Sequence, residues 1–170
     1  MDKKNKVKFC KNTRGFTLLE MIVAIFIVTV ALIGIMSLIH RSIVSAQISY
    51  SKLTAAYLAQ EGLEIIRNIR DSNWLAQSQN PNIPWDQNLN IGEWEVSYTD
   101  FTLTPYQGRN LKIDGGFYNY TRGIETKFKR KITLHKPQPN IIAVSVEVTW
   151  QERGIPYSVS IKENIYNWWR

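Results

Sequence analysis

The chain has 170 residues, a formal net charge of +7 and 44% hydrophobic residues. This length accommodates one modest domain beside a membrane segment and excludes a large multidomain enzyme. The charge is unevenly distributed, because residues 1–15 hold six lysines and arginines against one aspartate, which leaves a net +2 for residues 16–170. The high pI is therefore weak support for nucleic-acid binding.

An apolar run extends from Phe16 to Ile39. As a helix rising about 1.5 Å per residue it reaches roughly 36 Å, enough to cross the hydrocarbon core of a bilayer. The basic residues before it favour a cytoplasmic N-terminus, with the C-terminal part outside. One acid, Glu20, interrupts the run, and its insertion cost of about 3 kcal/mol is outweighed by the surrounding apolar side chains. The run predicts a membrane-spanning helix in which Glu20 has a function.

The segment RGFTLLEMIVAI, which begins at Arg14, resembles the class III signal peptides of type IV pilins and type II secretion pseudopilins. The resemblance implies that prepilin peptidase removes a leader of residues 1–15 by cutting between Gly15 and Phe16. It also implies methylation of the new amino group of Phe16, and pairing of Glu20 with the N-terminal amine of a neighbouring subunit. An ordinary secretory signal fits less well, because its apolar core spans only about 7 to 15 residues.

A second, less specific resemblance covers Ala55 to Leu75, which looks like the corresponding stretch of PilV-like minor pilins. The chain departs from many major pilins, which close a C-terminal loop with a disulfide. Its one cysteine, Cys10, lies in the leader, so the exported domain would have no disulfide and would depend on packing. This departure favours a minor pilin or pseudopilin.

Helical periodicity continues beyond the apolar run. Residues 16–40 are expected to form the transmembrane half of one helix and residues 41–71 its amphipathic half, with a stop at Asp71-Ser72-Asn73. The expected inward face consists of Ile48, Ala55, Leu58, Ala59, Gly62, Ile65, Ile66 and Ile69. A long loop then runs to Gly92, and we expect Trp74 and Trp85 to anchor it to the domain.

From Glu93 onward the hydrophobic period is two, which predicts about four antiparallel strands. The alternating positions are Trp94, Val96 and Tyr98 against Glu93, Glu95 and Ser97; Phe128, Arg130, Ile132 and Leu134 against Lys127, Lys129, Lys131 and Thr133; and a final hairpin of Ile142 to Trp150 and Tyr157 to Ile161, turning at Glu152-Arg153-Gly154. Phe101, Leu103 and Pro105 continue a shorter run. An antiparallel sheet needs one face covered, and the amphipathic half of the helix can cover it. The fold class is therefore α+β: the pilin fold, with a long N-terminal helix on a C-terminal antiparallel sheet formed within residues 72–170.

The sequence offers little for catalysis. His40 and His135 are isolated from any nucleophile or metal-binding pattern, so no catalytic residue, metal site or cofactor is predicted. Gly34 marks either close helix packing or local melting during assembly. Lys127, Lys129 and Lys131 could hold nucleic acid, but lysines also protect edge strands from aggregation, which is the interpretation we favour. The terminal Ile165, Trp168 and Trp169 are expected to pack against the sheet.

These patterns together predict a minor pilin or pseudopilin, a structural subunit of a filament rather than an enzyme. Its expected partners are prepilin peptidase, other pilin or pseudopilin subunits, an inner-membrane assembly platform with its ATPase, and the lipid bilayer. It would be a single-pass membrane protein before assembly, and part of a cell-surface or periplasmic filament afterwards. The alternatives are a secretion or competence pseudopilin, or a tip binding module that acts as an adhesin or DNA receptor.

Overall fold

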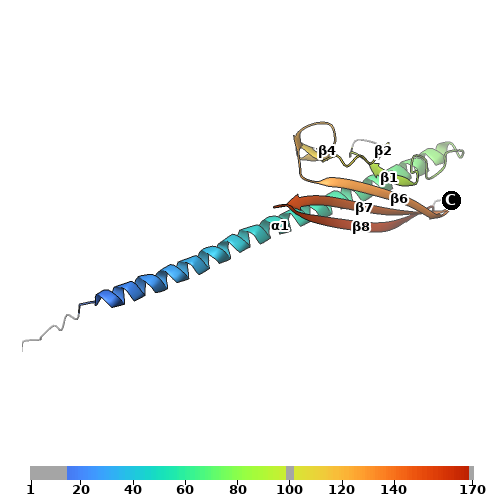
Figure 1. The fold of residues 1–170 in the computed structure, drawn as a ribbon. Coiled ribbons are helices and arrows are strands. Elements are labelled where there is room, and N and C mark those ends of the chain that lie inside the picture. Colours follow the sequence, from blue (N-terminus) through green and yellow to red (C-terminus); the bar gives the residue numbers. More distant parts are fainter. Residues whose placement is uncertain (1–14, 99–101, 169–170) are drawn as a thin grey trace, which may run out of the picture. The chain divides into compact units, whose positions relative to one another are not determined.

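The computed structural model describes residues 15–98 and 102–168, and Figure 1 shows their elements. Within these ranges one helix precedes eight strands. The elements are α1 (Leu18–Gln79), β1 (Gly92–Glu95), β2 (Thr104–Pro105), β3 (Lys112–Asp114), β4 (Phe117–Asn119), β5 (Ile124–Glu125), β6 (Lys129–Gln138), β7 (Ile141–Glu152) and β8 (Ile155–Tyr166). One long helix packed on an antiparallel sheet confirms the expected α+β pilin fold. The described residues divide into two compact units between Ser45 and Ala46.

The end of α1 differs from the prediction, since the helix passes Asp71-Ser72-Asn73 and ends at Gln79, shortly before Pro81. The predicted stop is wrong because Asn73 makes tertiary hydrogen bonds and does not form a turn. Asn73 is buried, and its Nδ2 donates to the carbonyls of Trp85 at 3.0 Å and Gln87 at 2.8 Å. Tertiary contacts thus override the turn preference of these residues. The connection to β1 shortens to residues 80–91.

The larger sheet has the order β2-β1-β6-β7-β8, and all its pairings are antiparallel. The β7–β8 hairpin turns at Arg153 and Gly154, which both have positive φ (52° and 79°), as a two-residue hairpin turn of the primed type requires. The predicted turn is confirmed. A second sheet, in the order β4-β3-β5, consists of strands of two or three residues that the sequence pattern did not separate into elements.

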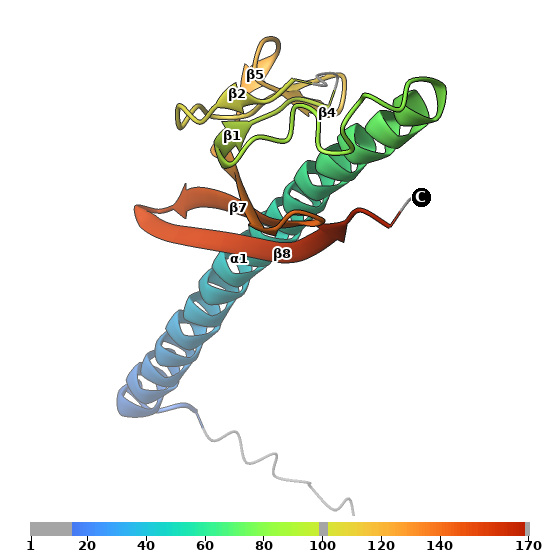
Figure 2. The same cartoon turned by 90° about the vertical axis from the view of Figure 1, so that its right-hand side faces the viewer.

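The core lies between the second half of α1 and the inner face of the larger sheet (Figure 2). The helix contributes its predicted stripe, although Ile48 and Ile65 are only half-buried. The fully buried members of this contact include Ala55, Leu58, Ala59 and Ile66 from α1 and Ile132, Val144, Val146 and Val148 from the sheet. Trp85 is also buried, which confirms that it anchors the loop, as does Trp74 at the end of the helix.

The burial of side chains around β1 differs from the predicted alternation. Glu95 was expected on the polar face, but its side chain is 0% exposed, and Val96 and Ser97 are buried after it. The alternation fails at Glu95, still within β1, because the segment after β2 covers its carboxylate with hydrogen bonds from Gln107 and Arg109. Phe101, within the expected second run, lies outside the described residues, as does Trp169.

Two chain ends also differ from expectation. The helix begins at Leu18 rather than Phe16. Trp168 does not pack flat on the sheet: it makes an edge contact with Trp74 of α1, with ring centroids 4.9 Å apart. Ile165 is buried in the core, as expected.

Arg130 is the largest fully buried side chain and lies between α1 and the sheet. Its Nη1 donates to the carbonyl of Leu58 and to Glu61 Oε1, both at 3.1 Å, and its Nη2 donates to the carbonyl of Val96 at 2.7 Å. One carboxylate and two carbonyls therefore compensate the charge through Nη1 and Nη2, while the buried Nε has no hydrogen-bond partner among the described residues. Gly62 gives it room, because a Cβ there would lie 3.1 Å from Arg130 Cδ and 3.0 Å from Val146 Cγ1.

Ser51, Lys127 and Glu152 form a smaller cluster that ties α1 to the end of β7. Lys127 Nζ donates to Ser51 Oγ at 2.8 Å and is ion-paired with Glu152, and Ser51 Oγ lies 3.2 Å from Glu152 Oε2. The hydrogen bond from Lys127, followed by that from Ser51, lowers the pKa of Glu152, although desolvation opposes them.

Replacing Gly62 with valine should lower the free energy of unfolding by about 1–3 kcal/mol, because the new side chain overpacks the contact with Arg130 and Val146. Chemical denaturation of the full chain in detergent micelles would measure this. Gly34→Val is the matched control, since a Cβ at Gly34 meets nothing within 4 Å. Equal stability of Gly62→Val and the control would show that Gly62 is not needed for the buried arginine.

The lowered pKa of Glu152 predicts an acid-sensitive contribution to stability. The contribution is complete above the ordinary glutamate pKa of 4.5 and is lost as the pH falls through the lower value of the folded state. Glu152→Gln should therefore flatten part of the fall in stability below about pH 4.5, which denaturation at a series of pH values would detect. Asp114→Asn, at an exposed turn, serves as the control. A pH profile unchanged by Glu152→Gln would contradict the linkage.

Candidate functional site: the N-terminal helix

The start of α1 has a defined cap. Thr17 precedes the helix, and its Oγ1 accepts a hydrogen bond from the backbone N–H of Glu20 at 3.3 Å, while its carbonyl accepts from Met21 N at 3.2 Å. This is the geometry of an N-cap, and the order Thr-Leu-Leu-Glu is that of a capping box. Gly15 and Phe16 lie just before this cap and are exposed. The bond between them is therefore next to a rigid helix start and accessible.

Glu20 occupies the third position of the helix, where an acid is favourable because it faces the positive end of the helix dipole. It is exposed in the isolated chain. Beside the predicted role in assembly, Glu20 thus has a local role at the helix start, for which the Thr-x-x-Glu spacing is a usable sequence signal. Pairing with an amine requires the charge of Glu20, whereas helix capping does not, because a glutamine satisfies a capping box without carrying charge.

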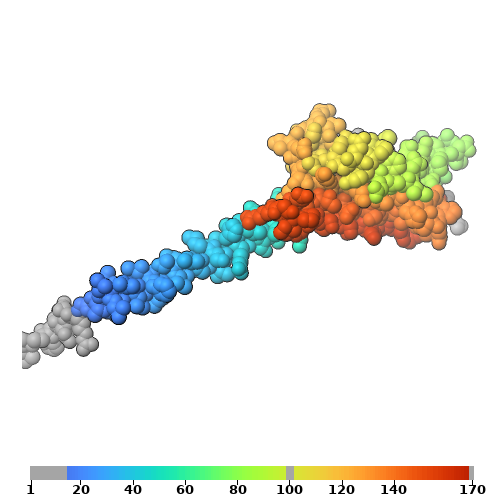
Figure 3. Space-filling view, in the orientation of Figure 1, coloured from blue at the N-terminus to red at the C-terminus, as the bar shows by residue number. Residues whose placement is uncertain are grey.

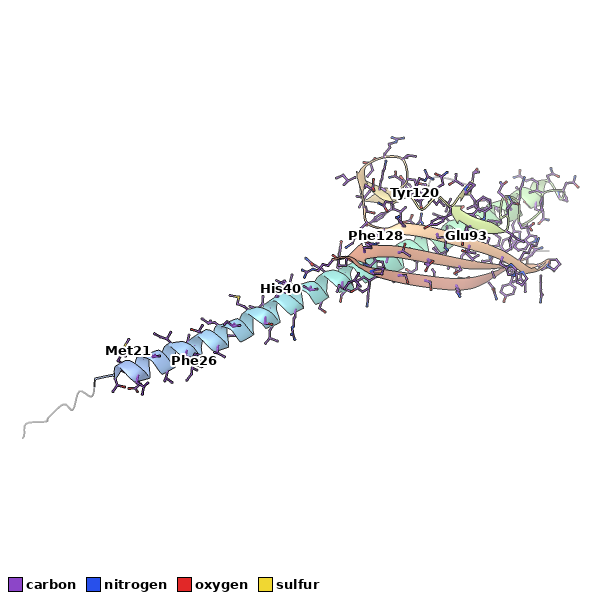
Figure 4. All side chains as sticks on the ribbon, in the orientation of Figure 1. Met21, Phe26, His40, Glu93, Tyr120 and Phe128 are labelled. Carbon is purple, nitrogen blue, oxygen red and sulfur yellow. The ribbon has the colours of Figure 1, made fainter. Side chains whose placement is uncertain are left out.

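The segment after Glu20 presents apolar side chains to the outside all round. The exposed fractions include 62% for Ile25, 67% for Phe26 and 65% for Ile33. Figure 3 shows this part of the helix, in blue, uncovered on the visible face, and Figure 4 shows its side chains projecting outward, with Met21, Phe26 and His40 labelled. By length and composition the segment could cross a membrane. Such a surface needs lipid or other apolar helices around it.

Gly34 lies within this uncovered segment. A Cβ there would meet nothing within 4 Å, so no packing inside the described chain requires glycine at this position. The helix is continuous through it. Whether it marks close helix packing or melting remains a prediction about the assembled state.

The three lysines of the alternative site do not form a free basic track. Lys127 is held by Ser51 and Glu152, as described above. Lys131 Nζ donates to Glu93 Oε1 at 3.0 Å and lies 3.8 Å from Glu147 Oε2. These contacts raise the pKa of Lys131, and the hydrogen bond to Glu93 contributes most. Lys129 is exposed at the start of β6. Two of the three charges are thus largely neutralised, which weakens the case for a phosphate-binding strip.

Sequence reasoning missed one buried carboxylate, Glu95, which pairs with the exposed Arg109. The carboxylate of Glu95 accepts the backbone N–H groups of Gln107 and Arg109 at 3.1 and 3.0 Å and the side-chain Nε of Arg109 at 2.7 Å. It fixes the segment after β2, and the guanidinium of Arg109 lies 5.0 Å from the ring centroid of Tyr120. Burial raises the pKa of Tyr120 to about 12. These groups are structural, since each is satisfied by its neighbours.

The remaining titratable side chains that could take part in catalysis or metal binding lie at the surface. Glu64 is paired with Arg67, three residues along the helix, and Arg67 also pairs with Glu163 of β8. His135 is exposed on the outer face of β6. Within residues 15–98 and 102–168, no three histidine, cysteine, aspartate or glutamate side chains gather in a group that could hold a metal ion.

Comparison with known proteins adds one finding. A family model described as the prokaryotic N-terminal methylation motif matches residues 10–36, which contain Gly15, Phe16, Glu20 and the first part of the apolar helix. No curated protein and no solved structure matches the chain. The motif is a prepilin peptidase cleavage site, and pilins assemble with other pilins, so the general kind of partner follows from it. The matched motif, together with the capped start of the helix and its uncovered apolar segment, supports a type IV pilin-like protein or pseudopilin.

Proposed function

We propose that the chain is a minor pilin or pseudopilin of a type IV pilus-like filament, with domain divisions after residues 15 and 40. Residues 1–15 act as a leader and 16–40 span the membrane, while the amphipathic half of the helix runs from residue 41 to Gln79, past the division expected at 71. The rest of the chain completes the globular part. Prepilin peptidase cleaves between Gly15 and Phe16 and methylates Phe16. The observation that carries this proposal is the exposed Gly15-Phe16 bond directly before a capped helix whose apolar face nothing in the described chain covers.

Assembly would proceed through the helix. An ionised carboxylate among apolar side chains costs about 2.5–3.5 kcal/mol on the insertion scale, and a cation beside it offsets this cost. The amine that cleavage creates on Phe16 of another subunit is such a cation. Pairing with Glu20 would thus stabilise one register between neighbouring helices.

The globular unit would supply lateral contacts, and the precursor would lie in the membrane with its N-terminus in the cytoplasm until an assembly platform extracts it. A PilV-like minor pilin fits the Ala55 to Leu75 stretch and the absence of a cysteine after residue 10. Secretion and competence pseudopilins share the same leader and are the alternative settings for the same mechanism.

Gly15→Leu should block cleavage, because the peptidase recognises a small residue before the cut. Intact mass spectrometry of protein from the native membrane should then find the full-length chain, whereas the unchanged protein should begin at Phe16 and carry one extra methyl group. Gly34→Leu, a matched change beyond the site, should still be processed. Normally shortened protein from Gly15→Leu would rule out the cleavage assignment.

Replacing Glu20 by alanine or by glutamine should leave cleavage intact but reduce the share of the protein in sheared filaments at least about tenfold, because the amine of the neighbouring Phe16 would then lie among apolar side chains without a counter-charge. Glutamine makes the test specific, because it preserves the capping box and removes only the charge. Immunoblotting of sheared and cell-bound fractions measures the share. Normal incorporation of Glu20→Gln would assign Glu20 to helix capping alone.

A further inference from the structure

A small cavity of about 160 Å³ lies beside the β3–β4 hairpin, apart from the N-terminal helix. Its lining residues are Tyr98, Asp114, Asn119, Thr121 and Arg122. The hairpin turns at Gly115 and Gly116, which both have positive φ (57° and 89°), and this turn pairs Asp114 with Phe117. Phe117 and Asn119 are two apart on β4, so the side chains of Asp114, Phe117 and Asn119 lie on one face of the small sheet.

An aromatic platform borders this cavity. The rings of Tyr98 and Phe117 are stacked, with centroids 5.2 Å apart and planes at 26°. Both residues are nevertheless largely open to solvent, with exposed fractions of 46% and 59%. Of the two, Tyr98 lines the cavity and Phe117 supports it from the other side of the stack, and the face of an aromatic ring accepts the weakly positive C–H groups of a ligand.

The polar groups around the platform are oriented and have unused hydrogen-bonding capacity. Asn119 is only 8% exposed, and its Oδ1 accepts from Thr121 N at 2.9 Å, Arg122 N at 2.7 Å and Thr121 Oγ1 at 3.4 Å. These three donors fix the amide, so its two Nδ2 hydrogens are the groups left for a ligand. Among the described residues, neither the Asp114 carboxylate nor the Arg122 guanidinium has an ion-pair partner, although both line the cavity.

The charge balance selects the class of ligand. One carboxylate and one guanidinium give the lining no net charge, which favours neither an anion nor a cation. The carboxylate accepts hydrogen bonds, while the guanidinium and the amide donate them, so adjacent hydroxyl groups that both donate and accept satisfy all three. At about 30 Å³ per water, the cavity has room for about five water-sized groups, so it would hold the hydroxyl-bearing edge of one sugar ring while the rest of the ring stays outside.

We propose that this cavity, hereafter the hairpin pocket, binds a neutral saccharide through a single hexose ring. The ring lies against Tyr98, which Phe117 supports, and its hydroxyls bond to Asp114, Asn119 and Arg122. The region lies beside Tyr120, which Figure 4 labels. This binding site is independent of cleavage at Gly15, so failure of either proposal leaves the other standing.

The test is a ligand-observed NMR titration of the full chain in a detergent without a sugar headgroup. The probes are the methyl glycosides of glucose, galactose and mannose, with tetramethylammonium and inorganic phosphate as charged alternatives. We expect saturable binding of at least one glycoside in the millimolar range, as suits an open pocket with one ring bound. No saturable binding of any glycoside, or binding of only a charged probe, would overturn the proposal.

Variants then locate the site. Phe117→Ala removes half of the platform and Asp114→Asn removes the charged acceptor, and each should weaken glycoside binding at least tenfold. Both side chains are exposed, so neither change should unfold the domain. Ile124→Ala is the matched control, because Ile124 is 77% exposed on β5 and belongs neither to the lining of the hairpin pocket nor to the Tyr98–Phe117 stack. Equal weakening by Ile124→Ala, or unchanged binding in Phe117→Ala, would assign the binding elsewhere and refute the hairpin pocket.

Discussion

The contact between the second half of α1 and β7 is the interaction on which the rest of the globular unit depends. This face of the helix carries small residues, namely Ala55, Ala59 and Gly62, so the valines of β7 approach it closely. The contact is buried on both sides. Each large apolar side chain removed from water here contributes about 1.5–3 kcal/mol. Because no cysteine follows Cys10, this packing takes the place of the covalent constraint that small exported domains often use.

Two buried charges, Arg130 on β6 and Glu95 on β1, add specificity to the packing around that contact. Arg130 would be costly inside the domain without Glu61 and the carbonyls of Leu58 and Val96, and these groups meet it only when α1 and the sheet are in one register. Glu95 acts in the same way on the segment after β2, where it collects two backbone donors and Arg109. Charge burial thus fixes the relative position of elements that apolar packing alone would leave free to slide.

One helix therefore serves two kinds of environment. From Ala46 onward it has a partner face in the same chain, and its exposed side carries polar residues such as Gln60 and Asn68. Before Ser45 its apolar side chains have no cover in the described chain, and Glu20 is the acid among them. The proposed functions are separated accordingly, since assembly would use the uncovered segment and saccharide binding the hairpin pocket.

The sequence by itself determined the helix, its change from apolar to amphipathic, the β7–β8 hairpin and the processing motif, because each rests on local periodicity or on contiguous residues. It also placed Arg130 on the apolar side of β6, since its phase matches that of Phe128 and Ile132. Only the tertiary structure decided the partner of Arg130, the burial of Glu95, the continuation of α1 past Asn73 and the grouping of Tyr98 with Phe117 and Asn119. These features join residues far apart in the chain, and a local pattern carries no information about which distant groups will satisfy a buried charge or amide.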